Sequence, residues 1–188
     1  MPGAFPLVGT LAALQEEHFQ GADMPTIDPS LRAGKVTKWG EWVKSKPLVV
    51  NGVESRWRIL GKYDLVSTNE DGTIGLIDCK VSDSQRDSGQ FYSPQLEAYA
   101  YALENPAAGK AQSVASMGLL VWRPTTAIGS NADEYGFGVM QRYVPVERDQ
   151  ANFLKVIGEF IDVLEGELPD AGSECQTCTY LTARNALD

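Results

Sequence analysis

The sequence predicts an α/β protein with a mixed β-sheet, on three observations. Apolar runs typical of strands, such as "TIGLIDCKVS" and "VASMGLLVWRP", are bounded by turn residues. Longer segments with helical periodicity precede, separate and follow these runs, and the resulting order (helices, strands, helix, strands, helix) is typical of an α/β domain. The chain has 188 residues, about one domain, and 43% of them are hydrophobic, which is enough for a sizeable core.

We expect one domain over residues 1–188, with N-terminal helices in 1–46, the sheet and one helix in 47–146, and a C-terminal helix and tail in 147–188. The predicted elements are a helix over 7–20, a second helix over 26–47 with Ser30 as its N-cap, a hairpin at Asn51-Gly52, strands that end in "LVST" and begin at "IGLIDCKVS", a helix over 88–105, strands over 114–124 and 135–146, and a helix capped by Asp149.

Several classes of protein are disfavoured by the sequence. No run of 18 apolar residues is present, so we expect no transmembrane helix. The N-terminal stretch lacks a positive n-region and a small-residue cleavage site, and three cysteines do not make a secreted disulfide framework. No G-x-x-x-x-G-K-[ST] loop is present, so no nucleotide cofactor is expected. We therefore expect a cytoplasmic protein, in the host cytoplasm if the chain is phage-encoded.

The charge is unevenly distributed along the chain. The net charge is −9, which disfavours a nucleic-acid partner. The segment from Leu31 to Lys62, however, has eight basic and two acidic residues, so it carries +6 and the remainder −15. It also contains Trp39, Trp42 and Trp57. Basic side chains interleaved with aromatics suit phosphates and stackable bases, although a solvated helix and hairpin with core-facing tryptophans would give the same pattern.

Asp78 and Lys80 are the candidate chemical residues of the apolar segment "IGLIDCKVS". Side chains two residues apart in a strand share a face, so these two project together while Cys79 points to the core. Mg²⁺ prefers carboxylates and water as ligands, and a lysine beside it can orient an attacking water. By itself this short pattern is weak evidence of a site.

The turn before this strand fixes the partner of Asp78. Residues 70–72, "EDG", suit a three-residue hairpin loop that ends on a left-handed glycine. That loop pairs Asn69 with Thr73 and places Asp64 directly opposite Asp78. Two facing carboxylates repel each other unless a cation lies between them, which indicates a hard-cation site. A loop of two or four residues would instead put the aspartates on opposite faces.

The segments "GKYDLV", "GLIDCKVS" and "YSPQLEAYAYAL" together resemble the PD-(D/E)XK nuclease superfamily, and in particular its RecB-like branch of phage and CRISPR-associated exonucleases. The pattern in that branch is G-x-x-D, a strand ending in D/E-x-K, and a helix reading Y-x-x-Q-L-x-x-Y. The residues that match it are Gly61, Asp64, Asp78, Lys80, Tyr92, Gln95, Leu96 and Tyr99. The resemblance implies a restriction-endonuclease-like three-layer α/β/α core with a central mixed β-sheet.

The resemblance also implies an activity, namely hydrolysis of DNA phosphodiesters by a Mg²⁺- or Mn²⁺-dependent nuclease, more in the manner of an exonuclease than of a sequence-specific endonuclease. It assigns the metal to Asp64, Asp78 and the backbone carbonyl of Cys79, activation of water to Lys80, and the placing of Lys80 or the substrate to Gln95. On this helix the resemblance implies that Tyr92 and Tyr99 face the DNA, with plain core packing as the alternative for both. Lys38 and Arg58 of the basic segment are the other expected DNA contacts.

Two departures from the family pattern matter for the metal expectations. The branch usually carries a metal-binding His in an upstream G-x-x-x-H helix, whereas this chain has Gly34-x-x-x-Lys38; Glu41 is the substitute we expect, ahead of His18. Some relatives also bind an iron–sulfur cluster through four cysteines. Here only Cys175 and Cys178 of that set remain, so no complete cluster is expected. Metal binding by this tail, for example a zinc site shared between two chains, is a lesser alternative.

Three functions stay open on the sequence. The first is a DNA nuclease in repair, recombination or phage or CRISPR processing, with a homo-oligomer or a helicase or recombination partner supplying grip on DNA. The second is a nuclease fold that has lost turnover and binds DNA or a protein. The third is an acidic α/β protein in which the motifs are coincidental.

Overall fold

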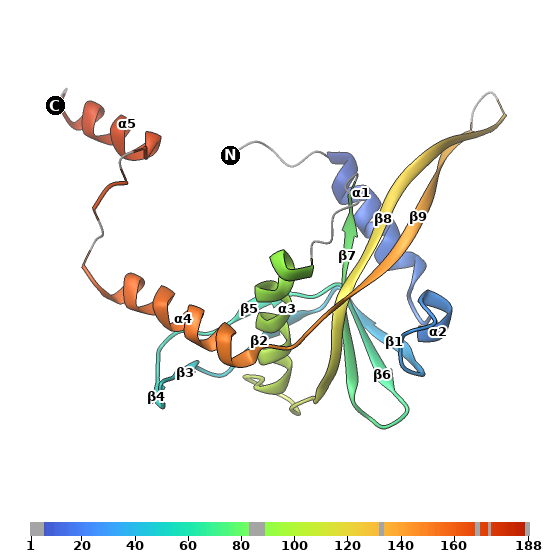
Figure 1. Ribbon diagram of the computed structural model, residues 1–188, viewed down its shortest axis with the longest axis horizontal. Helices are drawn as coiled ribbons and strands as arrows, with labels where there is room; N and C mark the ends of the chain where they lie inside the picture. The colour runs from blue at the N-terminus through green and yellow to red at the C-terminus, as the bar shows by residue number, and fades with distance from the viewer. Residues whose placement is uncertain (1–5, 83–88, 132–133, 168–169, 173, 187–188) are drawn as a thin grey trace.

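The computed structural model describes residues 6–82, 89–131, 134–167, 170–172 and 174–186 (Figure 1). Its centre is a five-stranded sheet in the order β1-β6-β7-β8-β9. Strands β7 and β8 are parallel, and the other neighbouring pairs are antiparallel. The strands are β1 (Gly34–Trp39), β2 (Trp42–Lys44), β3 (Val49–Val50), β4 (Val53–Glu54), β5 (Leu60–Lys62), β6 (Leu65–Asn69), β7 (Ile74–Val81), β8 (Val114–Asn131) and β9 (Glu134–Val146).

Helices cover both faces of this sheet (Figure 1). The helices are α1 (Pro6–His18), α2 (Met24–Ile27), α3 (Gly89–Glu104), α4 (Gln150–Glu165) and α5 (Gln176–Asn185). The segment containing α2 packs with Leu65, Ile77 and Leu120 in one core cluster, and α3 packs with Leu76 and Leu119 in the other. The predicted mixed α/β architecture, with a central sheet between helical layers, is therefore confirmed.

Two small antiparallel sheets flank the main one. Strands β3 and β4 form the predicted hairpin at Asn51-Gly52, where both turn residues have positive φ, 51° and 78°, as a tight turn of this kind requires. Strands β2 and β5 form a short ribbon in which Val43 pairs with Gly61. This ribbon lies against α3 and places the chain just ahead of Asp64.

The predicted register of the β6–β7 hairpin is confirmed. The N–H of Asn69 donates to the carbonyl of Thr73 at 2.8 Å, and Ser67 pairs with Gly75. Gly72 has φ of 79°, the left-handed conformation that the last position of the loop demands. The side chain of Asp71 accepts from the N–H of Thr73, which closes the turn. The turn residues thus fix which side chains of β6 and β7 lie opposite each other.

The prediction of a second helix over 26–47 is wrong. Only α2 is helical there, and β1 and β2 occupy residues 34–44, so the N-terminal region 1–46 is not purely helical. The segment pairs with β6, a strand some thirty residues later, from Gly34 opposite Asn69 to Trp39 opposite Leu65. This long-range ladder overrides the local N-cap signal at Ser30, whose side chain instead bonds Asp28. The sequence signal for a strand here was the alternation of apolar Val36 with polar Lys35 and Thr37, and in the structure Val36 is buried between exposed neighbours.

The remaining helix predictions are confirmed with small shifts at their ends. Helix α3 occupies the predicted 88–105 segment, and α4 begins after Asp149, whose carboxylate accepts from the N–H of Asn152 at 3.1 Å. Helix α4 packs on α3 through Tyr101 and Phe153. Within the described part of the chain, every helix is too short or too polar to cross a membrane.

Candidate active site at the end of strand β7

The two aspartates meet across the β6–β7 hairpin. Leu65 pairs with Ile77, and the next step of the same register sets Asp64 opposite Asp78. The carboxylate of Asp64 accepts a hydrogen bond from the backbone N–H of Cys79 at 2.6 Å. Asp78 is only 2% exposed, and Cys79 is buried on the opposite face, against the core. The expected face-sharing of the site residues, with Cys79 turned away, is confirmed.

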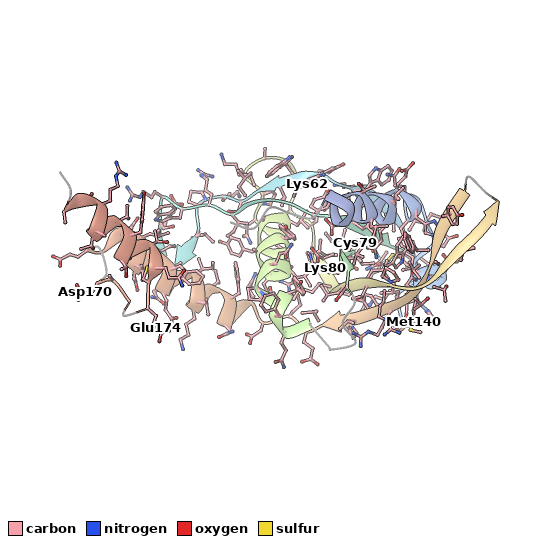
Figure 2. The ribbon with its side chains drawn as sticks, turned by 90° about the horizontal axis from the view of Figure 1, so that it is seen from above. Lys62, Cys79, Lys80, Met140, Asp170 and Glu174 are labelled. Carbon is pink, nitrogen blue, oxygen red and sulfur yellow. The ribbon has the colours of Figure 1, made fainter. Side chains whose placement is uncertain are left out.

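Two side chains hold Asp78 from different elements. The Nζ atom of Lys80 lies 2.5 Å from Oδ2 of Asp78, and the amide of Gln95 on α3 donates to Oδ1 at 2.9 Å. Gln95 also donates to the hydroxyl of Tyr99, one turn along the helix, at 3.1 Å. Gln95 therefore contacts Asp78 directly, whereas the family resemblance implied that it places Lys80 or the substrate. Figure 2 shows Lys80 and Cys79 in the region between α1 and α3.

Burial and mutual repulsion make these carboxyl groups poor anions in the absence of a cation. Burial, with a further contribution from the charges of Asp64 and Glu16, raises the pKa of Asp78 to about 6. Burial likewise raises the pKa of Asp64, although the N–H of Cys79 and the charge of Lys80 act in the opposite direction. Burial lowers the pKa of Lys80, but Asp78 and Asp64 outweigh it, so the pKa of Lys80 is raised and its ammonium stays charged.

Glu16, on α1, is a site residue that the sequence reasoning missed. Burial raises the pKa of Glu16, and the negative charge of Asp64 raises it further because the two carboxylates repel each other. Helix α1 packs on β7, and the amide of Gln15, fully buried, donates to the carbonyl of Leu120 at 2.7 Å. This anchor fixes the rotation of α1 and directs the neighbouring Glu16 toward the site. The acidic residue expected for this role was Glu41, whereas Glu16 is the one that lies on a helix.

The expectation for Glu41 is not supported by its surroundings. Glu41 lies in the turn between β1 and β2, not on a helix, and its carboxylate accepts from the hydroxyl of Tyr63 at 2.7 Å. His18, the other substitute considered, packs its ring against Phe19 and Trp122 on the α1 side of the sheet. Lys38 lies at a bulge in β1, where it pairs with Val66, and its side chain is half-buried.

The two helix tyrosines have separate structural roles. The ring of Tyr92 lies beneath the Lys80 ammonium, 4.6 Å from Nζ to the ring centroid. The ring of Tyr99 packs against the backbone at Gly61, where an added Cβ would lie 2.5 Å from Cε1 of the ring. Both rings are partly buried against the main core cluster. Core packing, the alternative considered for them, is thus present alongside contacts to the site.

The other candidates lie away from the two aspartates. Arg58 donates to the carbonyl of Ser45 at 3.2 Å, on the flank formed by β2 and β5. Cys175 and Cys178 lie at the start of α5, with their sulfur atoms 2.8 Å apart. Over the described residues, no three Cys, His, Asp or Glu side chains come together as a complete metal site.

The donor set at the end of β7 nevertheless suits a divalent cation. Apart from its ion pair with Lys80, the buried Oδ2 of Asp78 has no hydrogen-bond partner among the described residues. Asp64 faces Asp78 across the hairpin, and the negative charges of Asp64 and Glu16 both act on Asp78. Carboxylate oxygens are the ligands that Mg²⁺ and Mn²⁺ prefer. A cation would relieve the repulsion that raises the pKa of each acid, so the residues fit such an ion.

Facing carboxylates on a sheet end, a lysine two residues on and a glutamine from the covering helix define a metal-dependent hydrolase site on a restriction-endonuclease-like fold. The chain belongs to the PD-(D/E)XK nuclease superfamily, whose family model matches residues 11–183. Nucleases of this superfamily use divalent metals to cleave phosphodiester bonds.

The chain was also compared with individual proteins and solved structures. The chain is similar to a solved structure titled "Crystal structure of SSO0001", with 15% identity and a TM-score of 0.49, over 94% of this chain and 67% of the other. None of the curated proteins matches the sequence.

Proposed function

We propose that the chain is a Mg²⁺- or Mn²⁺-dependent deoxyribonuclease of the RecB-like branch that acts as an exonuclease. The observation that carries the proposal is the convergence of Asp64, Asp78, Lys80 and Gln95 at one end of β7. A buried acid that faces a second, partly buried acid costs stability. A catalytic role explains the presence of these two acids beside a charged lysine better than packing does.

The two aspartates and the carbonyl of Cys79 would hold the metal, and the charge of Glu16 acts on the same pair of aspartates. The bound ion would serve as a Lewis acid and lower the pKa of a bound water. Lys80 already contacts Asp78 through an ion pair, and Tyr92 supports its ammonium from beneath. With a cation held by Asp78, Lys80 would orient the attacking water and stabilise charge that develops on the phosphate.

Gln95 acts as a positioning residue. Its amide fixes Oδ1 of Asp78, and Tyr99 in turn accepts from the same amide, so α3 holds the carboxylate in one orientation. Such second contacts to a ligand typically change metal affinity or activity by 10–100-fold when removed. The proposed setting is a cytoplasmic one, in DNA repair, recombination or phage or CRISPR processing, with a helicase or a second copy as partner.

The proposal is tested by incubating purified protein with end-labelled linear and circular DNA, single- and double-stranded, in Mg²⁺, Mn²⁺ or EDTA. Lys80→Ala and Asp64→Ala are compared with Lys155→Ala, which removes an exposed lysine on α4. We expect metal-dependent loss of linear DNA only, abolished by the first two changes and unaffected by the third. Loss of circular DNA would make the enzyme an endonuclease. No cleavage with any metal, together with salt-sensitive DNA binding, would make it a binding module.

A further inference from the structure

The β2–β5 ribbon beside the site has two dissimilar faces. On the inner face, Val43 is buried and Gly61 lies against the ring of Tyr99. On the outer face, Trp42 is 70% exposed and Leu60 is 64% exposed. The outer face consists of Trp42, Lys44, Leu60 and Lys62. Two neighbouring exposed apolar side chains between two lysines form a patch that could meet a ligand with both apolar and anionic groups.

The strand register places an aromatic ring directly beside a cation. Trp42 pairs with Lys62, and Lys44 pairs with Leu60. Directly opposite residues of an antiparallel pair share a face, with their Cβ atoms about 4.5–5.5 Å apart. A flat apolar ring and an ammonium at this spacing match a nucleotide, which presents a base face and a phosphate.

The outer face is continuous with the active site. Asp64 follows Lys62 by two residues, and the N–H of Gly40 donates to the carbonyl of Asp64 at 2.9 Å. Lys62 and Glu16 converge over Gly40: a Cβ built there would lie 3.4 Å from Nζ of Lys62 and 3.4 Å from Oε2 of Glu16. The Lys62 end of the ribbon therefore lies next to Asp64 in the chain and beside Glu16; Figure 2 labels both Lys62 and Lys80.

Lys44 and Lys62 form no close ion pair within the described residues, unlike other basic residues of the same segment, and the charge of Lys62 acts on Glu16 and Asp64 of the site itself. Arg32, Lys35 and Arg56 form ion pairs with acidic residues elsewhere in the chain. In the described ranges, neither Lys44 nor Lys62 has a carboxylate oxygen within 4 Å. On a chain of net charge −9, unpaired lysines next to a phosphodiesterase site are suited to an anion.

We propose that the outer face of the β2–β5 ribbon binds an unpaired segment of the DNA substrate, with Trp42 stacked on a base and Lys62 on a phosphate beside the one that is cleaved. The inference rests on the proposed nuclease function and adds a substrate class to it. In a duplex, neighbouring base pairs cover both faces of each base, so Trp42 has a stacking partner only in a single strand or a frayed end. Lys44 contacts the next phosphate along the strand.

The test measures DNA binding and cleavage separately. Binding of fluorescent dT20, of a blunt duplex and of the duplex with a single-stranded overhang is followed by anisotropy in Ca²⁺, and cleavage of the same DNAs in Mg²⁺. The variants are Trp42→Ala, Trp42→Phe and Lys62→Ala. Tyr135→Ala, at a residue 77% exposed on β9, and Lys155→Ala on α4 are the matched controls.

We expect Trp42→Ala to weaken binding of dT20 and of the overhang about tenfold, as the loss of one base–aromatic stack does, and Trp42→Phe to restore most of it. Lys62→Ala should weaken binding and make the slope of log affinity against log salt shallower by about 0.7, the value for one phosphate of a single strand, whereas Trp42→Ala leaves the slope unchanged. The blunt duplex and the two controls should change less than twofold.

Each alternative result has a distinct meaning. If wild-type protein cleaves DNA but Trp42→Ala and Lys62→Ala bind dT20 normally, the inference is wrong and the nuclease function stands. If wild type binds dT20 through Trp42 and cleaves nothing, the inference stands and the catalytic proposal fails. If wild type binds no DNA in Ca²⁺, or both variants weaken blunt duplex as much as dT20, the single-strand surface is ruled out.

Discussion

The ring of Tyr99 lies over the backbone of Gly61 so closely that no side chain could stand there: a Cβ at position 61 would be 2.5 Å from Cε1 and 3.2 Å from Cδ1 of the ring. This contact joins the glycine three residues before Asp64 to the helix that carries Gln95. The segment of Gly61 and Asp64 is therefore joined to α3 by packing, in addition to the hydrogen bond between Gln95 of α3 and Asp78. Glycine is required here for space, since its φ is not in the left-handed region.

Gly61→Ala is expected to lower the free energy of unfolding by about 1–3 kcal/mol, the usual cost of forcing an extra methyl into a packed site. Displacing Tyr99 also removes the hydroxyl that orients Gln95, so cleavage should fall as well. Urea unfolding measures the first effect. In a Tyr99→Ala background the same change should cost much less; an equal cost would refute the steric explanation. Gly9→Ala, in open space on α1, should instead stabilise by up to about 1 kcal/mol.

Glu16→Gln is expected to weaken Mn²⁺ binding at least about tenfold, because it removes one of three carboxylates that share the local field. Isothermal titration calorimetry at neutral pH gives the affinity. Glu17→Gln is the matched control, since Glu17 is an exposed glutamate next to Glu16 on the same helix. Glu41→Gln should also leave the affinity unchanged, because that carboxylate is held by Tyr63. A loss of affinity at Glu41 in place of Glu16 would reverse our assignment.

Sequence reasoning succeeded where structure is local. The loop "EDG" and its left-handed glycine fix the β6–β7 register within a few residues, and that register is what sets Asp64 opposite Asp78. The helical motif likewise follows from periodicity along α3. These features depend on turn chemistry and on spacing, both of which a single sequence displays.

Sequence reasoning failed where contacts between distant segments determine the secondary structure or the direction of a side chain. Strand β1 forms because it pairs with β6, and the sequence around Ser30 does not indicate that partner. Glu16 and Glu17 are indistinguishable in sequence; only the burial of Gln15 against Leu120 selects which of them faces the site. The exposed face of Trp42 and Lys62 is similarly a product of the β2–β5 register, since the same basic, aromatic composition also fits a solvated helix.

The metal-free protein should lose stability as the pH rises from about 4 to about 6. Asp78 titrates near 3.8 when unfolded and at about 6 when folded, because burial, and then Asp64 and Glu16, disfavour its charge. Across that window the folded state keeps a proton that the unfolded state has lost, so the group's contribution declines through the folded pKa, by about 3 kcal/mol in total. Urea unfolding in EDTA at pH 4.5, 6 and 7.5 measures the decline.

Asp78→Asn provides the control for this titration. The amide cannot ionise, so the fall in stability between pH 4.5 and 7.5 should be smaller by most of that amount. Added Mn²⁺ should stabilise wild type more at pH 7.5 than at pH 5, because protons and metal compete for the same carboxylates. A pH slope identical in wild type and Asp78→Asn would show that other groups cause it.

The last prediction concerns Arg148, which joins α3 to the start of α4. Its Nε contacts both oxygens of Glu97 at 3.2 and 3.1 Å, and its Nη1 and Nη2 each contact Glu104 at 3.0 Å. Glu97 is only 1% exposed. Arg148→Ala leaves that carboxylate buried without its cation, so we expect a loss of about 3–5 kcal/mol in the free energy of unfolding.

Two comparisons make the Arg148 prediction specific. Arg32→Ala breaks an exposed ion pair with Asp71 and should change stability far less than Arg148→Ala, because water screens that pair. Glu97→Gln placed in the Arg148→Ala background removes the stranded charge and should restore part of the lost stability, because a neutral amide is cheaper to bury than an unpaired carboxylate. If the double variant is less stable than Arg148→Ala alone, the cost arises from lost packing of the arginine stem and not from the buried charge.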